Sequence, residues 1–193
     1  MRNSQIPKCD EVMMSGVEEP DIEQAKQPEE IFRRAVIKII KNILERKKEK
    51  NSLIEYFILQ NFGLDIAVFM KWSDNRSTVR FFELKAFVGS RQGGVGFGDS
   101  RGRGPQVDLL LLKNSQLDLA NKFIRWLLVI GTKPKGKDRF VIFDNIQAKN
   151  ATMGGVKRGK QNNFRISYLE KNAITWKKFL EKLEEFLVSR DEE

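Results

Sequence analysis

Two residues of opposite charge, two positions apart, interrupt a mostly apolar run in the first half of the chain. The segment from Val79 to Val88 is rich in Phe, Leu, Ala and Val and predicts a buried strand that carries Glu83 and Lys85. Side chains two residues apart on a strand share a face, so we expect this carboxylate and this ammonium side by side. Burying both is costly unless they are paired, bound to a metal or exposed at the strand end. We therefore expect a fold that builds a polar site around this strand.

A second apolar segment, Gly63–Met70, precedes this strand and carries one acid, Asp65. A polar stretch between the two segments predicts a hairpin turn. If Trp72 pairs with Thr78 across that turn, Asp65 lies opposite Lys85, and directly opposed side chains share a face of the sheet. A slip of one residue would move Asp65 to the other face, so the predicted cluster requires a register of this parity.

The clustered side chains could hold a hard cation. Asp65 and Glu83, with the backbone carbonyl of Leu84, offer oxygen ligands suited to Mg²⁺ or Mn²⁺. Such an ion would polarise a phosphodiester and activate water, and Lys85 would assist the attack of that water. The competing interpretation is a buried Asp65–Lys85 ion pair with Glu83 as a solvated neighbour. The same spacing recurs in residues 45–47, Glu-Arg-Lys, which we interpret as solvated charge at a helix end.

Composition excludes several other chemistries. The 193 residues contain no histidine and one cysteine, Cys9, which removes His-dependent hydrolysis, an intrachain disulfide and a cysteine zinc site. The net charge of +9 favours a polyanionic partner, most often nucleic acid, although surface charge for solubility would give the same excess. No apolar run reaches the ~20 residues of a membrane span, and no signal core is evident at the N-terminus. We therefore expect an intracellular protein, cytoplasmic or nucleoid-associated.

We expect one mixed α/β domain over residues 29–193, behind an acidic leader of residues 1–28 that is mobile or partly ordered. Apolar stripes with helical spacing predict one helix from Pro28 to about Lys48 and another from about Ile174 to Ser189. These stripes are typical of core-facing surfaces rather than of ligand sites.

The middle of the chain has weaker patterns. Residues 52–62 fit a strand or a short helix equally well. Residues 89–104 include seven glycines and predict a long loop. The remaining expected elements are a helix over about 105–123, buried strands at 126–130 and 139–143, and a last strand over 164–169.

The pattern of Asp65, seventeen intervening residues and then Glu83-Leu84-Lys85 on an apolar strand resembles the PD-(D/E)xK nuclease superfamily. That superfamily includes many restriction endonucleases and archaeal Holliday-junction resolvases. The resemblance spans roughly residues 29–145, with Gly63-Leu64 where the family often has a proline before the Asp. It implies an α/β fold with a single mixed-sheet, restriction-endonuclease-like core flanked by helices. It also implies a Mg²⁺-dependent DNA nuclease.

The resemblance implies further site residues. Many members add a glutamate from the first helix, and the candidates here are Glu30 and, second, Glu55. Each of these two is also an ordinary surface acid by its context. Some members use a glutamine after the E-x-K strand, and Gln106 matches that position. Because cleavage of two strands generally needs two sites, we also expect a homodimer.

Three basic loops are candidates to hold DNA. Glycine lets backbone N–H groups approach phosphates, and arginine can bind a phosphate with two hydrogen bonds. Each loop could equally be solvated surface charge. The candidate contacts are Arg91, Arg101, Arg103, Lys133, Lys135, Lys157, Arg158 and Lys160.

The sequence therefore favours a metal-dependent nuclease that acts on DNA, with branched or structured DNA among its candidate substrates. One alternative is a non-catalytic nucleic-acid-binding module that keeps the fold. Another is a carboxylate-only nuclease that uses Asp65, Glu83 and Asp144 and does not need Lys85.

Overall fold

The computed structural model describes residues 18–22, 26–88, 94–99 and 101–189. The helices are α1 (Pro28–Glu49), α2 (Pro105–Leu110), α3 (Asn114–Ala120), α4 (Asn145–Ala151), α5 (Ile166–Lys171) and α6 (Trp176–Val188). The strands are β1 (Leu53–Phe62), β2 (Leu64–Trp72), β3 (Ser77–Phe87), β4 (Gly94–Phe97), β5 (Ile124–Ile130), β6 (Phe140–Phe143) and β7 (Asn162–Arg165).

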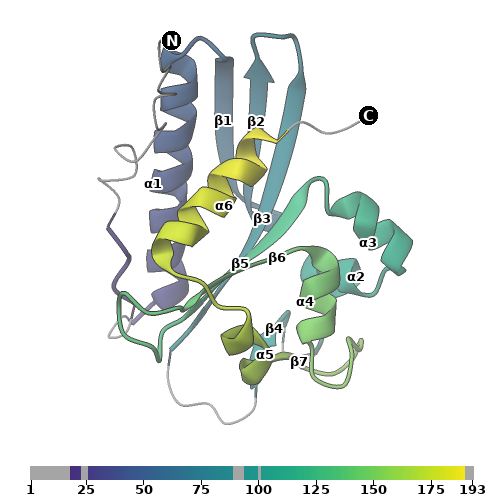
Figure 1. Ribbon diagram of the computed structural model, residues 1–193. Helices are drawn as coiled ribbons and strands as arrows, with labels where there is room; N and C mark the ends of the chain where they lie inside the picture. The colour runs from purple at the N-terminus through teal and green to yellow at the C-terminus, as the bar shows by residue number, and fades with distance from the viewer. Residues whose placement is uncertain (1–17, 23–25, 89–93, 100, 190–193) are drawn as a thin grey trace, which may run out of the picture.

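Five strands form the main sheet in the order β1-β2-β3-β5-β6 (Figure 1). The first three strands are antiparallel neighbours in chain order. β5 runs parallel to β3, because α2 and α3 carry the chain back between them, and β6 is antiparallel to β5. The fold is therefore mixed α/β, with β3 at the centre of the sheet.

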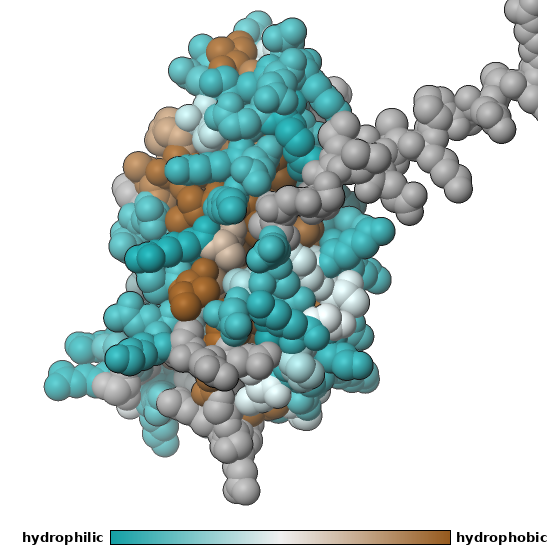
Figure 2. All heavy atoms as spheres, turned by 90° about the vertical axis from the view of Figure 1, so that its left-hand side faces the viewer, coloured by the Kyte–Doolittle hydropathy of each residue, from teal (hydrophilic) through white to brown (hydrophobic). Residues whose placement is uncertain are grey.

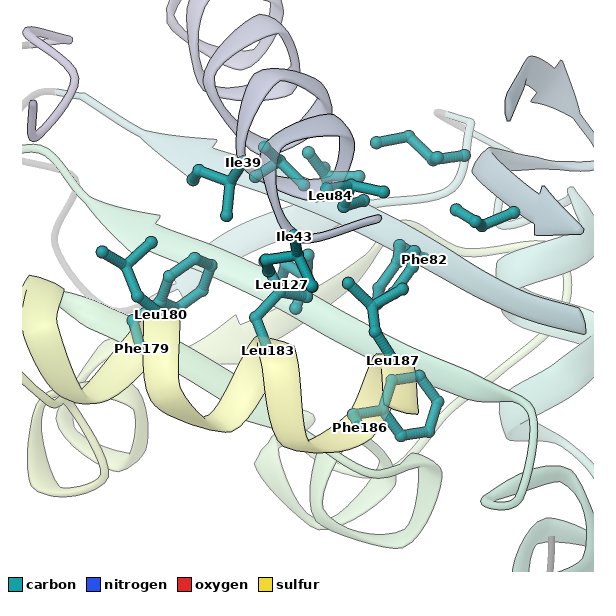
Figure 3. Packing of buried hydrophobic residues seen from close by; sticks show 14 of the residues in the cluster. Ile39, Ile43, Phe82, Leu84, Leu127, Phe179, Leu180, Leu183, Phe186 and Leu187 are labelled. Carbon is teal, nitrogen blue, oxygen red and sulfur yellow. The ribbon is translucent and has the colours of Figure 1, made fainter. Parts of the chain in front are cut away.

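The helices α1 and α6 cover one face of this sheet (Figure 1). Acids in the first turn of α1 and bases in its last turn complement the helix dipole, and its apolar stripe faces the core. Figure 3 shows Ile43 of α1 and Leu183 of α6 within the same buried cluster as Leu127 of β5. The buried residues of α1 are Phe32, Val36, Ile39, Ile40, Ile43 and Leu44.

A second, smaller core lies on the opposite face. There β4 and β7 form a two-stranded antiparallel sheet, and Phe97 stacks on Phe164 with ring centres 4.4 Å apart. Trp126 of β5 meets both rings edge-on and donates its Nε1–H to Asn145 Oδ1 at 2.9 Å. This core holds α2 and α4 against β5 and β6.

The two long amphipathic helices are confirmed, and residues 53–62 form a strand. The predicted helix over 105–123 was wrong, because two short helices occupy it and β5 begins at Ile124. The predicted glycine-rich loop contains β4, and the predicted strand over 164–169 ends at Arg165, where α5 follows. The errors in the glycine-rich loop and in the last strand concern β4 and β7. These two strands pair across some seventy residues of sequence, and local patterns do not link them.

Residues 18–22 of the acidic leader pack against the domain. Ile22 is buried in the main core, and the Pro20 carbonyl accepts a hydrogen bond from the buried Arg139. Glu19 forms an ion pair with the same arginine. The remainder of the expected mobile leader, apart from residues 26–28, lies outside the described residues. Within the described ranges, no helix is long and apolar enough to cross a membrane.

Candidate functional site

The hairpin of β2 and β3 brings the two predicted metal ligands level with each other. Backbone pairing extends to Ile66 opposite Phe82, and continuing that register places Asp65 opposite Glu83. Because strand side chains alternate, Asp65, Glu83 and Lys85 share one face of the sheet. The structure therefore places the three residues on a common face, as the sequence predicted.

The predicted register itself was wrong by two residues. Thr78 lies opposite Met70, rather than opposite Trp72 as expected. The turn is tighter than five residues, since the Trp72 N–H donates to the Arg76 carbonyl at 2.9 Å. Asn75 allows this tight turn with a φ of 66°, a left-handed conformation that asparagine tolerates well. A shift of two residues preserves the face of every side chain, so the cluster survives it.

Asp65 fills the gap where β2 and β3 stop pairing. Its Oδ2 accepts a hydrogen bond from the Leu84 backbone N–H at 2.8 Å. The N–H and C=O of a strand residue point to the same edge, so the Leu84 carbonyl faces the same gap. Oxygen atoms of the Asp65 side chain and of the Leu84 backbone therefore face one opening between the strands.

Glu83 is buried and has few hydrogen-bond donors around it. Its exposed fraction is 0%, and the donors that face it are the side chains of Lys85 and Gln106. The Lys85 Nζ lies 3.0 Å from Glu83 Oε1 as an ion pair. Burial raises the pKa of Glu83 to about 7 against the effect of the Lys85 charge, and the negative charge of Asp65 contributes to the rise. The site thus contains a carboxyl group that changes charge near neutral pH and has open lone pairs.

Lys85 lies between two carboxylates. Besides Glu83, its Nζ contacts Glu29 Oε1 in the first turn of α1 at 3.4 Å. Burial lowers the pKa of Lys85, but the charges of Glu83, Glu29 and Asp65 outweigh burial and raise it above its usual value. Lys85 is therefore an ammonium at neutral pH, able to neutralise negative charge and unable to accept a proton.

A second cation, Arg33 of α1, holds Asp65. Its Nη2 is 2.9 Å from Asp65 Oδ1, and its Nη1 is 2.9 Å from Glu30 Oε2. A carboxylate has about four lone-pair positions, so two hydrogen bonds leave Asp65 with room for further ligands. Glu30, the expected helix glutamate, instead pairs with Arg33 and Arg34. Glu29 is the helix acid that reaches the lysine of the site.

Gln106, at the start of α2, joins the cluster. Its side-chain amide faces Glu83 and lowers the pKa of that carboxyl group. Gly104 precedes α2 with a φ of 120°, a conformation that favours glycine. A Cβ at this position would also lie 2.9 Å from Gln106 Oε1 and would crowd the Gln106 side chain. The structure therefore brings Gln106 to the same site as the strand residues, at the position that the sequence suggested.

Two other candidate acids lie apart. Glu55 is exposed on β1, opposite Lys71. Asp144 caps α4, where its Oδ1 accepts a hydrogen bond from the Gln147 N–H at 2.7 Å. Among the described residues, no three acidic, histidine or cysteine side chains converge to hold a metal. A carboxylate-only site with Asp144 is therefore not formed.

The residues present fit a hard divalent cation that completes its coordination with water. The donor set consists of oxygens alone, and two of them are the oxygens of Glu83, whose lone pairs Lys85 and Gln106 occupy only in part. Asp65 and the Leu84 carbonyl supply the other protein oxygens. Mg²⁺ commonly binds through one or two carboxylates while keeping several waters, so two acids suffice.

A cavity of about 250 Å³ opens beside the site. Its polar wall includes Lys85 and Glu29, and its apolar wall includes Phe87, Ile130 and Leu169. The cavity leaves space for a substrate group directly next to the Lys85 ammonium.

Two of the predicted basic loops come together in the structure. A Cβ on Gly102 would lie 2.0 Å from the Lys160 carbonyl oxygen, so the backbones of the two loops are in direct contact. Arg103 pairs with Asp99 at 3.0 Å, and Arg158 pairs with Asp108 of α2 at 2.7 Å. We call residues 101–103 and 157–160 the basic loop pair. Its side chains with no ion pair among the described residues are Arg101, Lys157 and Lys160.

The third basic loop is engaged differently. Lys133 lies 3.8 Å from Glu170, and Lys135 lies 3.8 Å from Asp21 of the leader. Both lysines thus face acids of this chain, which weakens the prediction that they contact DNA. Arg91 lies outside the described residues.

Sequence reasoning missed Glu29 and Arg33. The only available signal was their spacing of four residues on α1, which places them on one helix face.

Comparison with models of protein families, with curated proteins and with solved structures found no match to this chain. The fold is accordingly described by its own architecture, a five-stranded mixed sheet flanked by helices.

Proposed function

We propose that this protein is a metal-dependent nuclease of the PD-(D/E)xK type that hydrolyses DNA phosphodiester bonds. The observation that carries this proposal is the fully buried Glu83 carboxylate beside Asp65 and Lys85. A buried carboxylate is costly unless a cation or donors compensate it, and Lys85 and Gln106 together leave some of its lone-pair positions open. The same geometry supports interpreting the mixed sheet as a restriction-endonuclease-like core.

Each side chain has a defined task in this proposal. Asp65, Glu83 and the Leu84 carbonyl would bind Mg²⁺ or Mn²⁺, which supplies Lewis acidity toward the phosphate and lowers the pKa of a bound water. The Lys85 ammonium, kept protonated by Glu83 and Glu29, would stabilise the negative charge that develops on the phosphate.

Substrate binding is supported by the charge distribution. The chain carries a net charge of +9, and the basic loop pair adjoins α2, the helix whose first turn places Gln106 at the site. Cations that contact phosphates give affinity without sequence information. We therefore expect recognition of backbone and shape rather than of a base sequence.

A non-catalytic nucleic-acid-binding module is the second candidate. The observation that favours it is the Arg33 guanidinium on Asp65, which neutralises this acid with a protein cation. If Arg33 remains there, the chain would bind DNA in a salt-dependent manner and would not cleave it.

The test is an assay with linear, single-stranded and four-way-branched DNA, with and without Mg²⁺ or Mn²⁺. We expect metal-dependent cleavage of at least one substrate, and a loss of about 100-fold or more on Asp65→Ala or Lys85→Ala. Lys47→Ala, in the helical E-x-K, is the matched control and should retain activity. Cleavage that survives both site substitutions would refute the proposed site. Salt-dependent binding without cleavage under any metal would favour the second candidate.

A further inference from the structure

The two edges of the main sheet differ in how they are closed. At one edge, β6 has four residues, and backbone hydrogen bonds from Phe140 N–H to Ile174 O and from Ile174 N–H to Phe140 O cover it. At the other edge, β1 has ten residues, and no strand of the described chain pairs with its outer side. Within the part of the chain that the structure describes, the outer backbone groups of β1 have no strand partner.

β1 also lacks the features that normally protect an edge strand. Its sequence, LIEYFILQNF, contains one charged residue, Glu55, and neither lysine nor proline. Exposed edges usually carry such residues because they prevent pairing with other chains. Ile54 is 49% exposed, Phe57 54% and Leu59 37%. An open, apolar edge of this length indicates a surface that a partner covers.

The exposed side chains extend from a row of aromatic rings. Phe57 stacks on Phe69 of β2 with ring centres 4.5 Å apart, and Phe69 meets Phe81 of β3 edge-on at 6.5 Å. Phe57 is thus fixed on one side by Phe69 and open on the other. Figure 2, which views the molecule from its α1 side, shows exposed apolar atoms in brown over its upper part.

We propose that β1 pairs antiparallel with β1 of a second copy, about a two-fold axis at Ile58. In that register Phe57 faces Leu59 of the partner subunit, and the regular pairing is limited to residues 56–60, because Asn61 has a left-handed φ of 58° and the register of β1 shifts before Glu55. Apolar residues then meet apolar residues, and Glu55, the single carboxylate, lies outside the paired segment, so no like charges are opposed. A two-fold axis makes each of these contacts twice with one surface patch.

The chemistry of β1 favours this occupant over nucleic acid. The strand offers one carboxylate and no cation, whereas a phosphate backbone requires Lys or Arg. A second copy is also complementary to β1 without any change in its sequence.

The arrangement would place both candidate sites on one face of a continuous sheet. The two copies of β3 would be five strand spacings apart, about 24 Å, and the two sites would be offset by about 20 Å along the strands. Two sites so placed could act on the two strands of one duplex, a consequence that depends on the proposed function. The pairing itself does not depend on that function, and its test uses no activity measurement.

The experiment measures the mass of the full chain by analytical ultracentrifugation over a range of concentrations up to about 1 mM. One double variant carries Phe57→Lys and Leu59→Lys, and the other carries Phe57→Glu and Leu59→Glu. Each variant alone should oppose like charges across the axis, while a mixture should oppose lysine to glutamate. Leu111→Lys with Leu119→Lys, on exposed leucines outside the sheet, is the control of equal charge.

We expect a dimer for the wild type and the control, monomers for each β1 variant alone, and a heterodimer when the two variants are mixed. The amides of β1 should gain protection from hydrogen exchange as the wild type associates. Restoration by mixing also shows that the variants are folded. A wild type that is monomeric at every concentration, or β1 variants that remain dimeric alone, would overturn the proposal.

Discussion

The chain contains two E-x-K triplets, and their surroundings make them chemically different. In β3, the Glu83 carboxylate and the Lys85 ammonium lie 3.0 Å apart in a buried setting. In α1, Glu45 instead accepts a hydrogen bond from the Tyr56 hydroxyl, and Lys47 pairs with Glu184 of α6 at 3.2 Å.

Backbone geometry explains the contrast. Residues two apart on a strand share a face, whereas on a helix they point about 200° apart at about 100° per residue. The strand therefore brings the two charges of β3 together, and the helix directs those of α1 to separate partners. A motif of three residues acquires chemistry only from the element that carries it.

The largest expected difference concerns activity. Lys85→Ala should reduce metal-dependent DNA cleavage by about 100- to 1000-fold, because it removes the ammonium that stabilises phosphate charge. Lys47→Ala removes an equal charge from the helical triplet and should change the rate little. Initial rates under single-turnover conditions measure both. If both variants lost cleavage activity equally, the difference between the two triplets would have no effect on catalysis.

The next effect concerns stability and its dependence on pH. Because folding raises the pKa of Glu83 from 4.5 to about 7, the folded state holds a proton that the unfolded state releases between these values. The stabilisation is complete below pH 4.5 and is lost as the pH rises to about 7. Glu83→Gln should therefore increase the free energy of unfolding at pH 8 by about 3 kcal/mol.

Urea unfolding of wild type and variant at pH 5 and pH 8 measures this effect. Glu45→Gln, in the helical triplet, is the matched substitution and should change stability by less than about 0.5 kcal/mol at either pH. A Glu83→Gln protein that is less stable than the wild type at pH 8 would show that the ionised carboxylate is favoured by the fold.

Metal binding should produce a somewhat smaller stabilisation. Mg²⁺ or Mn²⁺ at about 30 times its dissociation constant should stabilise the wild type by about 2 kcal/mol. The effect should be larger at pH 8 than at pH 6, because protons compete with the metal for Glu83. Thermal unfolding with and without metal measures it. Asp65→Asn and Glu83→Gln should abolish the effect, and Glu45→Gln should retain it.

The smallest expected effect lies in the helical triplet itself. Burial, with the hydrogen bond and charge of Glu45, raises the pKa of Tyr56 from 10.0 to about 12. Glu45→Gln should lower this pKa without returning it to 10.0, since burial is the largest cause. Ultraviolet titration of tyrosinate follows the change. A Tyr56 pKa that does not move would show that Glu45 has no influence on it.

Local patterns were sufficient for much of this architecture. The stripes that end in Leu44 and Leu187 predicted α1 and α6, because helix faces are encoded every three to four residues. The parity of the β2–β3 hairpin was also predictable, since a wrong parity would have exposed Ile66 and Val68. Asp65, Glu83 and Lys85 followed from that parity.

Other features depend on contacts that local patterns do not encode. β4 contains Gly94 and Gly96, which have low strand propensity, and it exists through its pairing with β7. Glu29 rather than Glu30 reaches Lys85, and adjacent helix positions differ by about 100° in direction, so the docking angle of α1 decides between them. Arg33 finds Asp65 through the same docking.

The bond between Asp65 and the Leu84 amide makes one proton an indicator of the whole site. That amide donates to the carboxylate that would hold the metal, at 2.8 Å. Its chemical shift in a ¹⁵N-labelled sample should respond to any change in charge or ligation at Asp65, including release of Arg33. A single backbone resonance could thus follow the state of the site in solution without substrate and without a substitution.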